Sequence, residues 1–264
     1  MSLMTPSGTP RRDTASSSLV AGARTAVVAA WVVIATFFLG VLAIVVSFFS
    51  RTGNPIHRIG RVWGRSILAV SGIRVSVTGV ERIAVDQPYI FMANHQSNLD
   101  IPVLLGHLPV QFRWLAKAEL FKIPVFGQAM RGAGYISIDR SDRQAAFESL
   151  RQAAEKIRRG LSILIFPEGT RSMDGSLQPF KKGGFVMAVG AGVPVVPVAV
   201  RGTYDIMPKN SLLIRPKEVR VAIGEPIATT GITLDSKEAL IEAVRKAICR
   251  GLAEASIKMQ EYRC

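Results

Sequence analysis

The sequence predicts an α/β fold, a single domain with a largely parallel or mixed sheet flanked by helices. An N-terminal membrane-anchoring helical segment precedes that domain. Short β-rich segments alternate with helical stretches from about residue 73 onward, as in α/β domains. Residues 25–49 form an apolar run without a charged residue or a proline. No internal repeat is visible, and 264 residues suffice for one large domain behind an anchor.

The composition excludes several classes of protein. Hydrophobic residues make up 48% of the chain and charged residues 20%, which excludes a disordered protein, a collagen and a coiled coil. Lys and Arg number 33 against 19 Asp and Glu, a formal net charge of +14 that implies an acidic partner. The basic residues are scattered or close to the apolar run, without interleaved aromatics or a nucleic-acid motif. We therefore expect an anionic membrane surface or a phosphorylated substrate, and no nucleic acid.

The first expected element is a membrane helix behind a tail. Residues 1–24 are rich in Ser, Thr, Ala and Gly, which predicts a disordered tail. As an α-helix, residues 25–49 would extend roughly 37 Å, more than the ~30 Å hydrocarbon core of a bilayer. The run is too long for a secretory signal, and no cleavage site follows it. A spanning helix and a half-inserted helix both fit this pattern.

A second helix of a different kind is expected over residues 55–72. Apolar residues recur at helical spacing and arginines line the opposite side, namely Ile56, Ile59, Trp63, Ile67 and Val70 against Arg58, Arg61 and Arg65. Such a helix either lies at the headgroup boundary of a membrane or packs on the domain as an ordinary amphipathic helix. Residues 25–72 are thus predicted to be a two-helix membrane-anchoring segment. Because arginines follow the apolar run, the positive-inside rule places the domain at residues 73–264 on the cytoplasmic side of the membrane.

Within that domain the pattern predicts seven strands, at residues 73–80, 88–93, 112–116, 135–138, 161–166, 195–200 and 219–223. The clearest helix begins at Ser141 with a capping-box spacing and stops at Gly160; its expected core face is Phe147, Leu150, Ala154 and Ile157. A last helix begins near Asp235 and should bury Leu240, Val244, Ala247 and Ile248. In such a sheet, chemistry gathers where strands end and loops begin.

The first polar cluster at a strand end runs from Asn94 to Asp100. A histidine in this position, His95, can work as a general base. Asp100 falls in the expected first turn of a helix, and the turn between them can fold its carboxylate onto the imidazole. A surface histidine beside a helix-capping aspartate explains the same pattern, so the cluster alone leaves both interpretations open.

The second cluster, residues 167–172, follows the most hydrophobic strand. Gly169 permits a tight turn that can present backbone N–H groups to an anion. Arg171 offers a planar, bidentate guanidinium suited to a phosphate. A strand-exit turn with a solvated ion pair between Glu168 and Arg171 is the alternative.

Two further clusters carry weaker signals. Asp139 and Arg140 end another strand, where a capped strand end is the simpler explanation. Residues 193–200 are apolar and contain two prolines, Pro194 and Pro197, which favours an edge strand or a tunnel wall, with core packing as the default.

Together the four clusters, NHQSNLD, GYISIDR, FPEGTRS and VPVVPVAV, resemble the four blocks of the glycerolipid acyltransferases. The resemblance is specifically to the 1-acylglycerol-3-phosphate acyltransferases, whose third block is present letter for letter. It covers about residues 75–205. The segment at residues 116–120, with Pro124 and Gly127 beyond it, is similar to the family's segment between its first two blocks.

The resemblance implies a reaction and a set of residue roles. His95 would deprotonate the sn-2 hydroxyl of lysophosphatidic acid, which then attacks an acyl thioester, and Asp100 would orient His95. Substrate binding would involve Glu168, Gly169, Thr170, Arg171, Arg140 and Lys117, with the apolar fourth block along the acyl-chain path. No metal and no cofactor is implied, since acyl-CoA or acyl-carrier protein serves as co-substrate. The partners would be a lipid acceptor, that acyl donor and an anionic membrane surface.

Several alternatives remain open on these residues. The acceptor could instead be another lysolipid, such as a lyso-ornithine lipid, or glycerol 3-phosphate. His95 could activate water in a thioesterase, although water needs no anion-binding loop. Neither the acyl donor nor its chain length is specified by the motifs.

Overall fold

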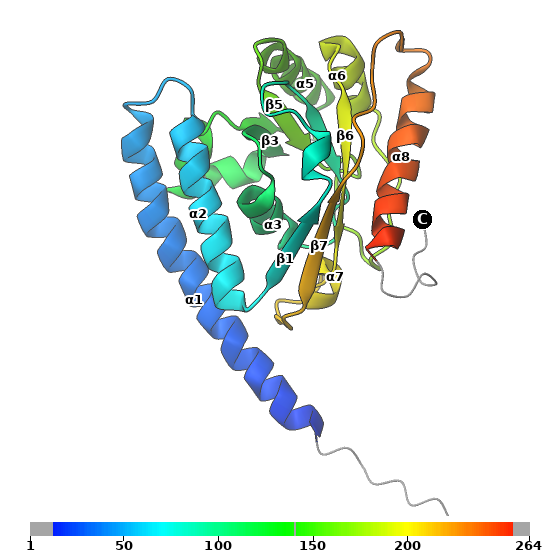
Figure 1. Cartoon of the computed structure of the whole chain (residues 1–264). Helices are drawn as coiled ribbons and strands as arrows, with labels where there is room; N and C mark the ends of the chain where they lie inside the picture. Colours follow the sequence, from blue (N-terminus) through cyan, green and yellow to red (C-terminus); the bar gives the residue numbers. More distant parts are fainter. Residues whose placement is uncertain (1–12, 140, 256–264) are drawn as a thin grey trace, which may run out of the picture.

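The computed structural model describes residues 13–139 and 141–255, and within them seven strands form one sheet (Figure 1). The strands follow the order β1-β7-β6-β2-β5-β3-β4 across the sheet. Their bounds are β1 Arg74–Thr78, β2 Ile90–Ala93, β3 Phe112–Lys117, β4 Ile136–Ile138, β5 Ser162–Ile165, β6 Val195–Arg201 and β7 Glu218–Ile223. All seven predicted strands are present, with their ends shifted by one or two residues.

The sheet is mixed, as the sequence predicts. The five strands from β6 to β4 pair in parallel, β7 runs antiparallel to β6, and β1 pairs in parallel with β7. Every residue of β2 and β5 is buried, which is typical of central strands covered on both faces. Because Met92 pairs with Ile165, β2 and β5 end at the same edge of the sheet. The first and second polar clusters therefore leave the sheet side by side.

The apolar fourth cluster forms β6, which lies inside the sheet between β2 and β7 and not at its edge. Pro197 is tolerated there because the ladder with β7 ends beside it. Its carbonyl accepts a hydrogen bond from Gly224 N at 2.8 Å, one residue past the end of β7. In any other residue the backbone N–H would point in the same direction, past the end of β7, so proline removes no hydrogen bond from the ladder between β6 and β7.

Helices cover both faces of the sheet. They are α1 Asp13–Ser47, α2 Asn54–Ser71, α3 Asp100–His107, α4 Phe126–Gly132, α5 Arg143–Arg158, α6 Gly183–Ala191, α7 Thr203–Ile206 and α8 Lys237–Glu254, with 3₁₀ turns at Val80–Arg82 and Ala118–Lys122. Alternation along β2 divides the core in two: Phe91 packs with α2 and α3, whereas Ile90 and Met92 pack with α5, α6 and α8. Figure 1 shows these two layers on opposite sides of the sheet.

Two details of the predicted helices need correction. The N-cap of α5 is Asp142, not Ser141: its Oδ1 accepts hydrogen bonds from Gln144 N and Ala145 N at 2.8 and 3.0 Å. Phe147 is 64% exposed, and the side of α5 that packs on the core is formed by Ala146, Leu150, Ala153, Ala154 and Ile157. In α8 the predicted inward face is confirmed, with Leu240, Val244 and Ile248 buried.

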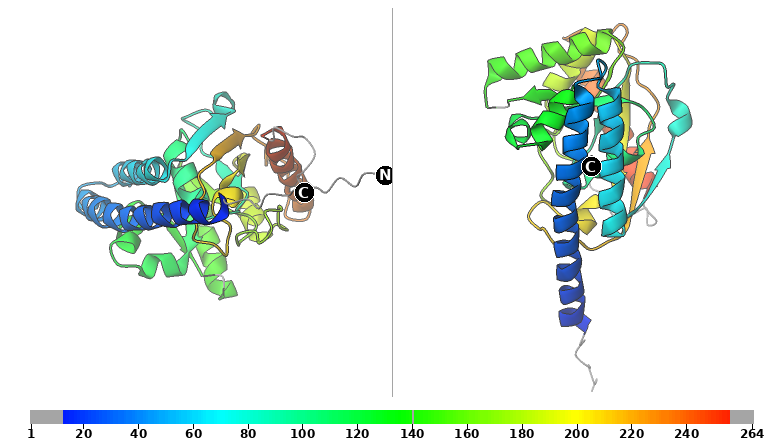
Figure 2. Two further views of the ribbon diagram at one scale, coloured as in Figure 1. Left: turned by 90° about the horizontal axis from the view of Figure 1, so that it is seen from below. Right: turned by 90° about the vertical axis from the view of Figure 1, so that its left-hand side faces the viewer.

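The first helix begins earlier than the sequence predicts. α1 starts at Asp13, so residues 13–24 of the predicted disordered tail are helical, while residues 1–12 lie outside the described residues. Extending an existing helix requires only one residue to be fixed per added hydrogen bond, and this stretch contains three alanines and no proline. Figure 1 and the right-hand view of Figure 2 show the start of α1 projecting beyond the sheet.

α1 is a candidate membrane anchor that also packs on the domain. Among the described helices, it is the one long and apolar enough to cross a bilayer. It buries Val28, Ala35 and Ala43, and it exposes the apolar side chains of Val33, Phe37, Phe38, Leu42 and Val45; the exposed Phe48 and Phe49 follow in the turn after it. The exposed face provides the surface that a bilayer would cover.

α2 packs on the domain as an amphipathic helix, which is one of the two arrangements that its sequence allows. Its apolar residues Ile56 and Ile67 are buried, and Trp63 donates its indole N–H to Thr36 Oγ1 on α1 at 3.0 Å. Two of the three arginines on its other side contact protein, while Arg58 is exposed. Arg61 Nη2 lies 3.4 Å from Val110 O, and Arg65 Nε donates to Gly106 O at 2.8 Å, in the last turn of α3. A cation at that position also opposes the negative end of the α3 dipole.

A buried basic cluster attaches the two N-terminal helices to the sheet. Arg113 on β3 is 1% exposed and donates to Thr52 O at 2.7 Å and to Asn54 Oδ1 at 2.5 Å, in the connection between α1 and α2. Beside it, His57 Nδ1 lies 3.0 Å from Tyr135 Oη. Burial and the charges of Arg113 and Arg61 lower the pKa of His57 to about 3.

His57 makes the stability of the fold dependent on pH. Its pKa of about 3 lies below the unfolded value of 6.5, so the stabilisation is complete above pH 6.5 and is lost as the pH falls towards 3. We expect His57→Asn, which cannot take up a proton, to lower the free energy of unfolding more at pH 7.5 than at pH 5. Denaturant titrations in detergent measure both values. Tyr135→Phe is the non-titrating control. If His57→Asn lowered the free energy of unfolding equally at the two pH values, the lowered pKa of His57 would be contradicted.

Candidate active site

The first polar cluster places His95 against Asp100 directly after β2. His95 Nδ1 lies 2.8 Å from Asp100 Oδ2, and the aspartate is fully buried. Because a carboxylate only accepts, the proton of the neutral imidazole resides on Nδ1 and its Nε2 carries a lone pair. The histidine side chain is 14% exposed, which leaves the imidazole accessible from one side. An imidazole oriented in this way can accept a proton at Nε2.

The same carboxylate folds the turn between the two residues. Asp100 Oδ2 also accepts hydrogen bonds from Gln96 N at 2.7 Å and Ser97 N at 2.9 Å. These donors bend residues 95–99 around the first residue of α3, where the helix dipole favours a negative charge. The spacing of five residues thus follows from one oxygen serving two backbone N–H groups and one imidazole.

Phe166, the first residue after β5, supports the imidazole from one face. The two rings are stacked with centroids 3.9 Å apart and planes within 8°. The FPEGTRS loop, residues 166–172, then returns to the same histidine, because Ser172 N donates to His95 O at 2.8 Å. Gly169 adopts the left-handed conformation, with φ 74°, that this tight turn requires.

Glu168 is buried and holds the two loops together. Its Oε1 accepts from His95 N at 2.6 Å and its Oε2 from Gln178 N at 2.9 Å. Burial raises the pKa of Glu168 to about 7, against the opposing effect of these two donors. With both oxygens occupied and only 2% of the residue exposed, Glu168 positions the backbone of His95. That Glu168 binds substrate stays a prediction, because both of its oxygens already accept backbone N–H groups.

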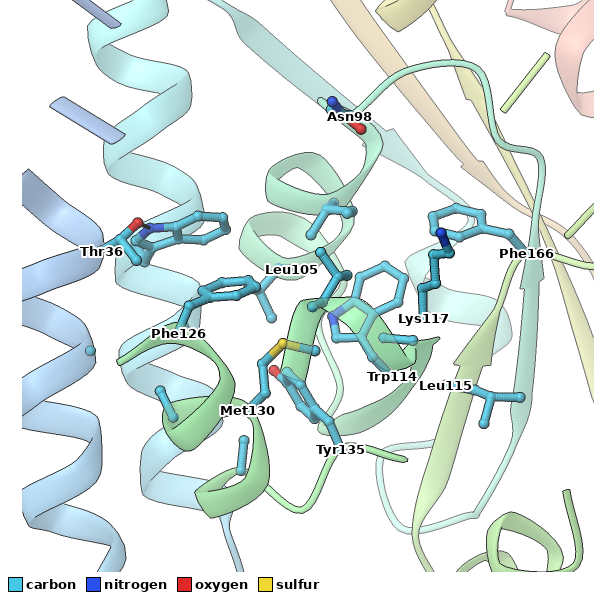
Figure 3. A pocket seen from close by; sticks show the side chains of 18 of the residues that line it. Thr36, Asn98, Leu105, Trp114, Leu115, Lys117, Phe126, Met130, Tyr135 and Phe166 are labelled. Atoms are coloured by element: carbon cyan, nitrogen blue, oxygen red, sulfur yellow. Dashed lines mark hydrogen bonds between the residues drawn. The ribbon is translucent and has the colours of Figure 1, made fainter. Parts of the chain in front are cut away.

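A cavity of about 540 Å³ opens at His95 and extends between the N-terminal helices and the sheet. Figure 3 shows its walls, formed by apolar side chains that include Leu105, Trp114, Phe126 and Met130, with Tyr135 near one end. α1 and α2 contribute further lining residues, among them Leu39, Gly40, Ala43, Ile59 and Gly60. The polar residues Gly169, Thr170 and Arg171 border the same cavity as His95.

The remaining predicted binding residues differ in their surroundings. Lys117 lines the cavity, but its Nζ pairs with Glu119 Oε1 at 3.0 Å, and both side chains are more than half exposed. Arg140 lies outside the described residues. The fourth cluster, β6, contributes no residue to the lining of this cavity, so its expected place along the acyl-chain path stays a prediction.

Known proteins share both this sequence and this architecture. A family model described as Acyltransferase matches residues 74–201. The 1-acyl-sn-glycerol-3-phosphate acyltransferase BAT2 of Brassica napus chloroplasts is 38% identical over 202 residues, which cover 71% of this chain and 58% of the relative. The 1-acyl-sn-glycerol-3-phosphate acyltransferase alpha of Homo sapiens is 34% identical over 220 residues, which cover 83% and 78%.

A solved structure extends the likeness to three dimensions. The crystal structure of the 1-acyl-sn-glycerophosphate (LPA) acyltransferase PlsC from Thermotoga maritima has a TM-score of 0.77 and 32% identity, covering 93% of this chain and 98% of that one. This chain belongs to the acyltransferase family. It spans less than three fifths of the length of the chloroplast relatives it matches.

Two residues that build this acyltransferase site have structural roles that the sequence patterns do not indicate. Asn94 bridges β2 to β6, with Nδ2 donating to Val200 O at 2.8 Å and Oδ1 accepting from Val200 N at 2.7 Å. Arg245 on α8 donates to Gln178 O and Leu177 O at 3.0 and 3.1 Å, behind the loop that Glu168 holds. No local pattern points to Arg245, because its partners lie more than sixty residues away. Asn94 stands in a block that the sequence does single out.

Replacing Glu168 tests its positioning role. In Glu168→Gln, one amide oxygen can still accept an N–H, but the amide NH₂ faces the second donor. We expect turnover to fall on the order of 10- to 100-fold as His95 is displaced, with little change in acceptor KM. Initial rates on detergent-solubilised protein measure both constants. Glu238→Gln, which removes an exposed carboxylate on α8, is the matched control, and an equal effect of both changes would argue against this role.

Proposed function

We propose that this acyltransferase moves a fatty acyl group from an acyl thioester to the sn-2 hydroxyl of 1-acyl-glycerol-3-phosphate, producing phosphatidic acid. The observation that supports this most strongly is the shared cavity. It combines an imidazole oriented by a buried carboxylate, an apolar space for a hydrocarbon chain and an arginine beside the base. The names of the relatives point to the same acceptor.

The proposed reaction begins at His95 Nε2, which takes the proton of the acceptor hydroxyl as the oxygen attacks the thioester carbonyl. The tetrahedral intermediate collapses with cleavage of the carbon–sulfur bond. The imidazolium returns its proton to the departing thiolate, and Asp100 stabilises the positive charge in between. The acceptor hydroxyl attacks directly, so no covalent acyl-enzyme forms and the thioester enters as co-substrate without any cofactor.

The acceptor phosphate is assigned to Arg171. Its guanidinium borders the cavity beside His95 and makes one weak contact, with Nη1 3.5 Å from Lys209 O. No carboxylate in residues 13–139 and 141–255 forms an ion pair with it. A thioesterase would not need this cation for its acceptor, because water carries no charge. Lyso-ornithine lipid and glycerol 3-phosphate remain the alternative acceptors, and either acyl-CoA or acyl-carrier protein the donor.

The same proposal places the enzyme on the membrane, with its sheet domain facing the cytoplasm. The exposed apolar face of α1 would sit in the bilayer, and Arg51 and Arg58 would remain on the cytoplasmic side. Because α1 and α2 also form walls of the cavity, its opening would lie close to the lipid phase. An acceptor lipid could then reach His95 by diffusion within the membrane.

Substitution of the base tests the reaction. His95→Ala should lower turnover with lysophosphatidic acid by ~10²–10⁴-fold and leave the fold intact. Asp100→Asn should also lower it, since an amide can hold the imidazole in the wrong tautomer. Purified protein, labelled acyl-CoA or acyl-carrier protein and a panel of lysolipids provide the measurement. His57→Asn is the control for loss of a histidine elsewhere, and a near wild-type rate for His95→Ala would exclude this mechanism.

Substitution of Arg171 tests the acceptor assignment. Arg171→Lys keeps the charge but removes the planar pair of donors, so the acceptor KM should rise while the donor KM changes little. Arg171→Ala should raise it further. Steady-state kinetics with each substrate varied in turn separates the two constants. A rise confined to the donor KM would instead assign Arg171 to the phosphates of the donor.

A further inference from the structure

A second cation, Lys209, borders the cavity next to Arg171. Lys209 follows α7, far in sequence from the polar clusters at the ends of β2 and β5. Its Nζ donates to Thr170 Oγ1 at 3.2 Å and to Arg171 O at 3.1 Å. These contacts place the ammonium over the FPEGTRS loop, and Lys209 lines the same cavity as His95 and Arg171.

The positive charges here are not balanced by protein. Within the described residues, Lys209 and Arg171 form no ion pair with a carboxylate. Glu168, two residues before Thr170, is turned inward and accepts from backbone N–H groups. By contrast, Lys117 in the cavity wall is paired with Glu119. Two unpaired cations beside one cavity form a site for an anion.

The segment that carries Lys209 is held at both ends. Ser97 Oγ, in the first polar cluster, donates to Met207 O at 2.7 Å. Five residues past the lysine, Ile214 N donates to Thr25 Oγ1 on α1 at 2.9 Å. Lys209 is therefore fixed between the catalytic turn and the N-terminal helix, and its contribution does not depend on folding of a loop around the ligand.

We propose that Lys209 is a second phosphate-binding residue, which together with Arg171 selects an acceptor with a phosphate monoester. This inference rests on the proposed function and narrows its acceptor class. A phosphate monoester carries close to two negative charges at neutral pH, which one guanidinium cannot match. Arg171 supplies two directed donors and Lys209 a compact point charge. A zwitterionic headgroup, such as that of a lyso-ornithine lipid, carries an ammonium group that both cations would repel.

Binding and turnover measured side by side test this assignment. Trp63 and Trp114 line the cavity, so their fluorescence should report ligand binding to the full chain in detergent. The two probes are lysophosphatidic acid and its uncharged counterpart, monoacylglycerol. Lys209→Gln should reduce the preference for the phosphorylated lipid about tenfold, raise the acceptor KM to a similar extent and leave kcat within about threefold. Lys209→Arg should restore most of the preference.

The control is Lys217→Gln, an exposed lysine of the same segment outside the cavity lining, which should behave as wild type. An unchanged preference in Lys209→Gln, an equal loss in Lys217→Gln, or a rise only in the donor KM would each overturn the inference. So would a wild-type protein that binds both lipids equally. If the wild type binds lysophosphatidic acid selectively but does not acylate it, the proposed function is wrong, while the phosphate-binding role of Lys209 is retained.

Discussion

A carboxylate that is completely buried needs hydrogen-bond donors to offset its charge, and Asp100 receives three of them on Oδ2, whereas its Oδ1 has no partner among the described residues. Two of them are backbone N–H groups of the preceding turn, so the charge shapes the chain that carries the histidine. The third is the imidazole itself, whose tautomer is thereby fixed. The position, orientation and tautomer of His95 all follow from its contacts with this one oxygen.

Glu168 is likewise a buried carboxyl group that accepts backbone N–H groups, in the loop after the neighbouring strand β5. Its two oxygens accept N–H groups from His95 and Gln178, which tie the loop after β5 to the turn after β2. Parallel pairing brings the two strand ends together, and the buried carboxylate fixes the distance between the turn and the loop that leave them. The proposed base and the proposed phosphate-binding residues are thus arranged by two buried carboxyl groups, both of which accept backbone N–H groups.

Sequence patterns predicted those parts of the molecule that depend on residues close together in the chain. Strands appeared where β-rich runs occur, and His95 with Asp100 could be paired because their contact closes a short turn. The role of Glu168 could not be found in this way, since a carboxylate beside an arginine equally suggests an exposed ion pair; only burial distinguishes the two. Lys209 and Arg245 act across the fold, on partners more than thirty residues away, and no spacing rule covers such contacts. Pro197 indicated an edge strand because the sequence does not show where the neighbouring strand stops.

The division into an anchor and a domain is where the structure departs furthest from the sequence pattern. A helix that served only to hold the chain at a membrane could have any apolar sequence, but α1 and α2 approach the domain too closely for that. A Cβ on Gly64 would lie 2.8 Å from Pro102 O in α3, and one on Gly40 would lie 2.5 Å from Val125 Cγ1. Backbone oxygen cannot yield to such a contact, so α2 can lie against α3 only with glycine at that position. The N-terminal helices are therefore a wall of the cavity, and the proposed membrane-facing surface and the proposed acyl-chain space are two sides of the same pair of helices.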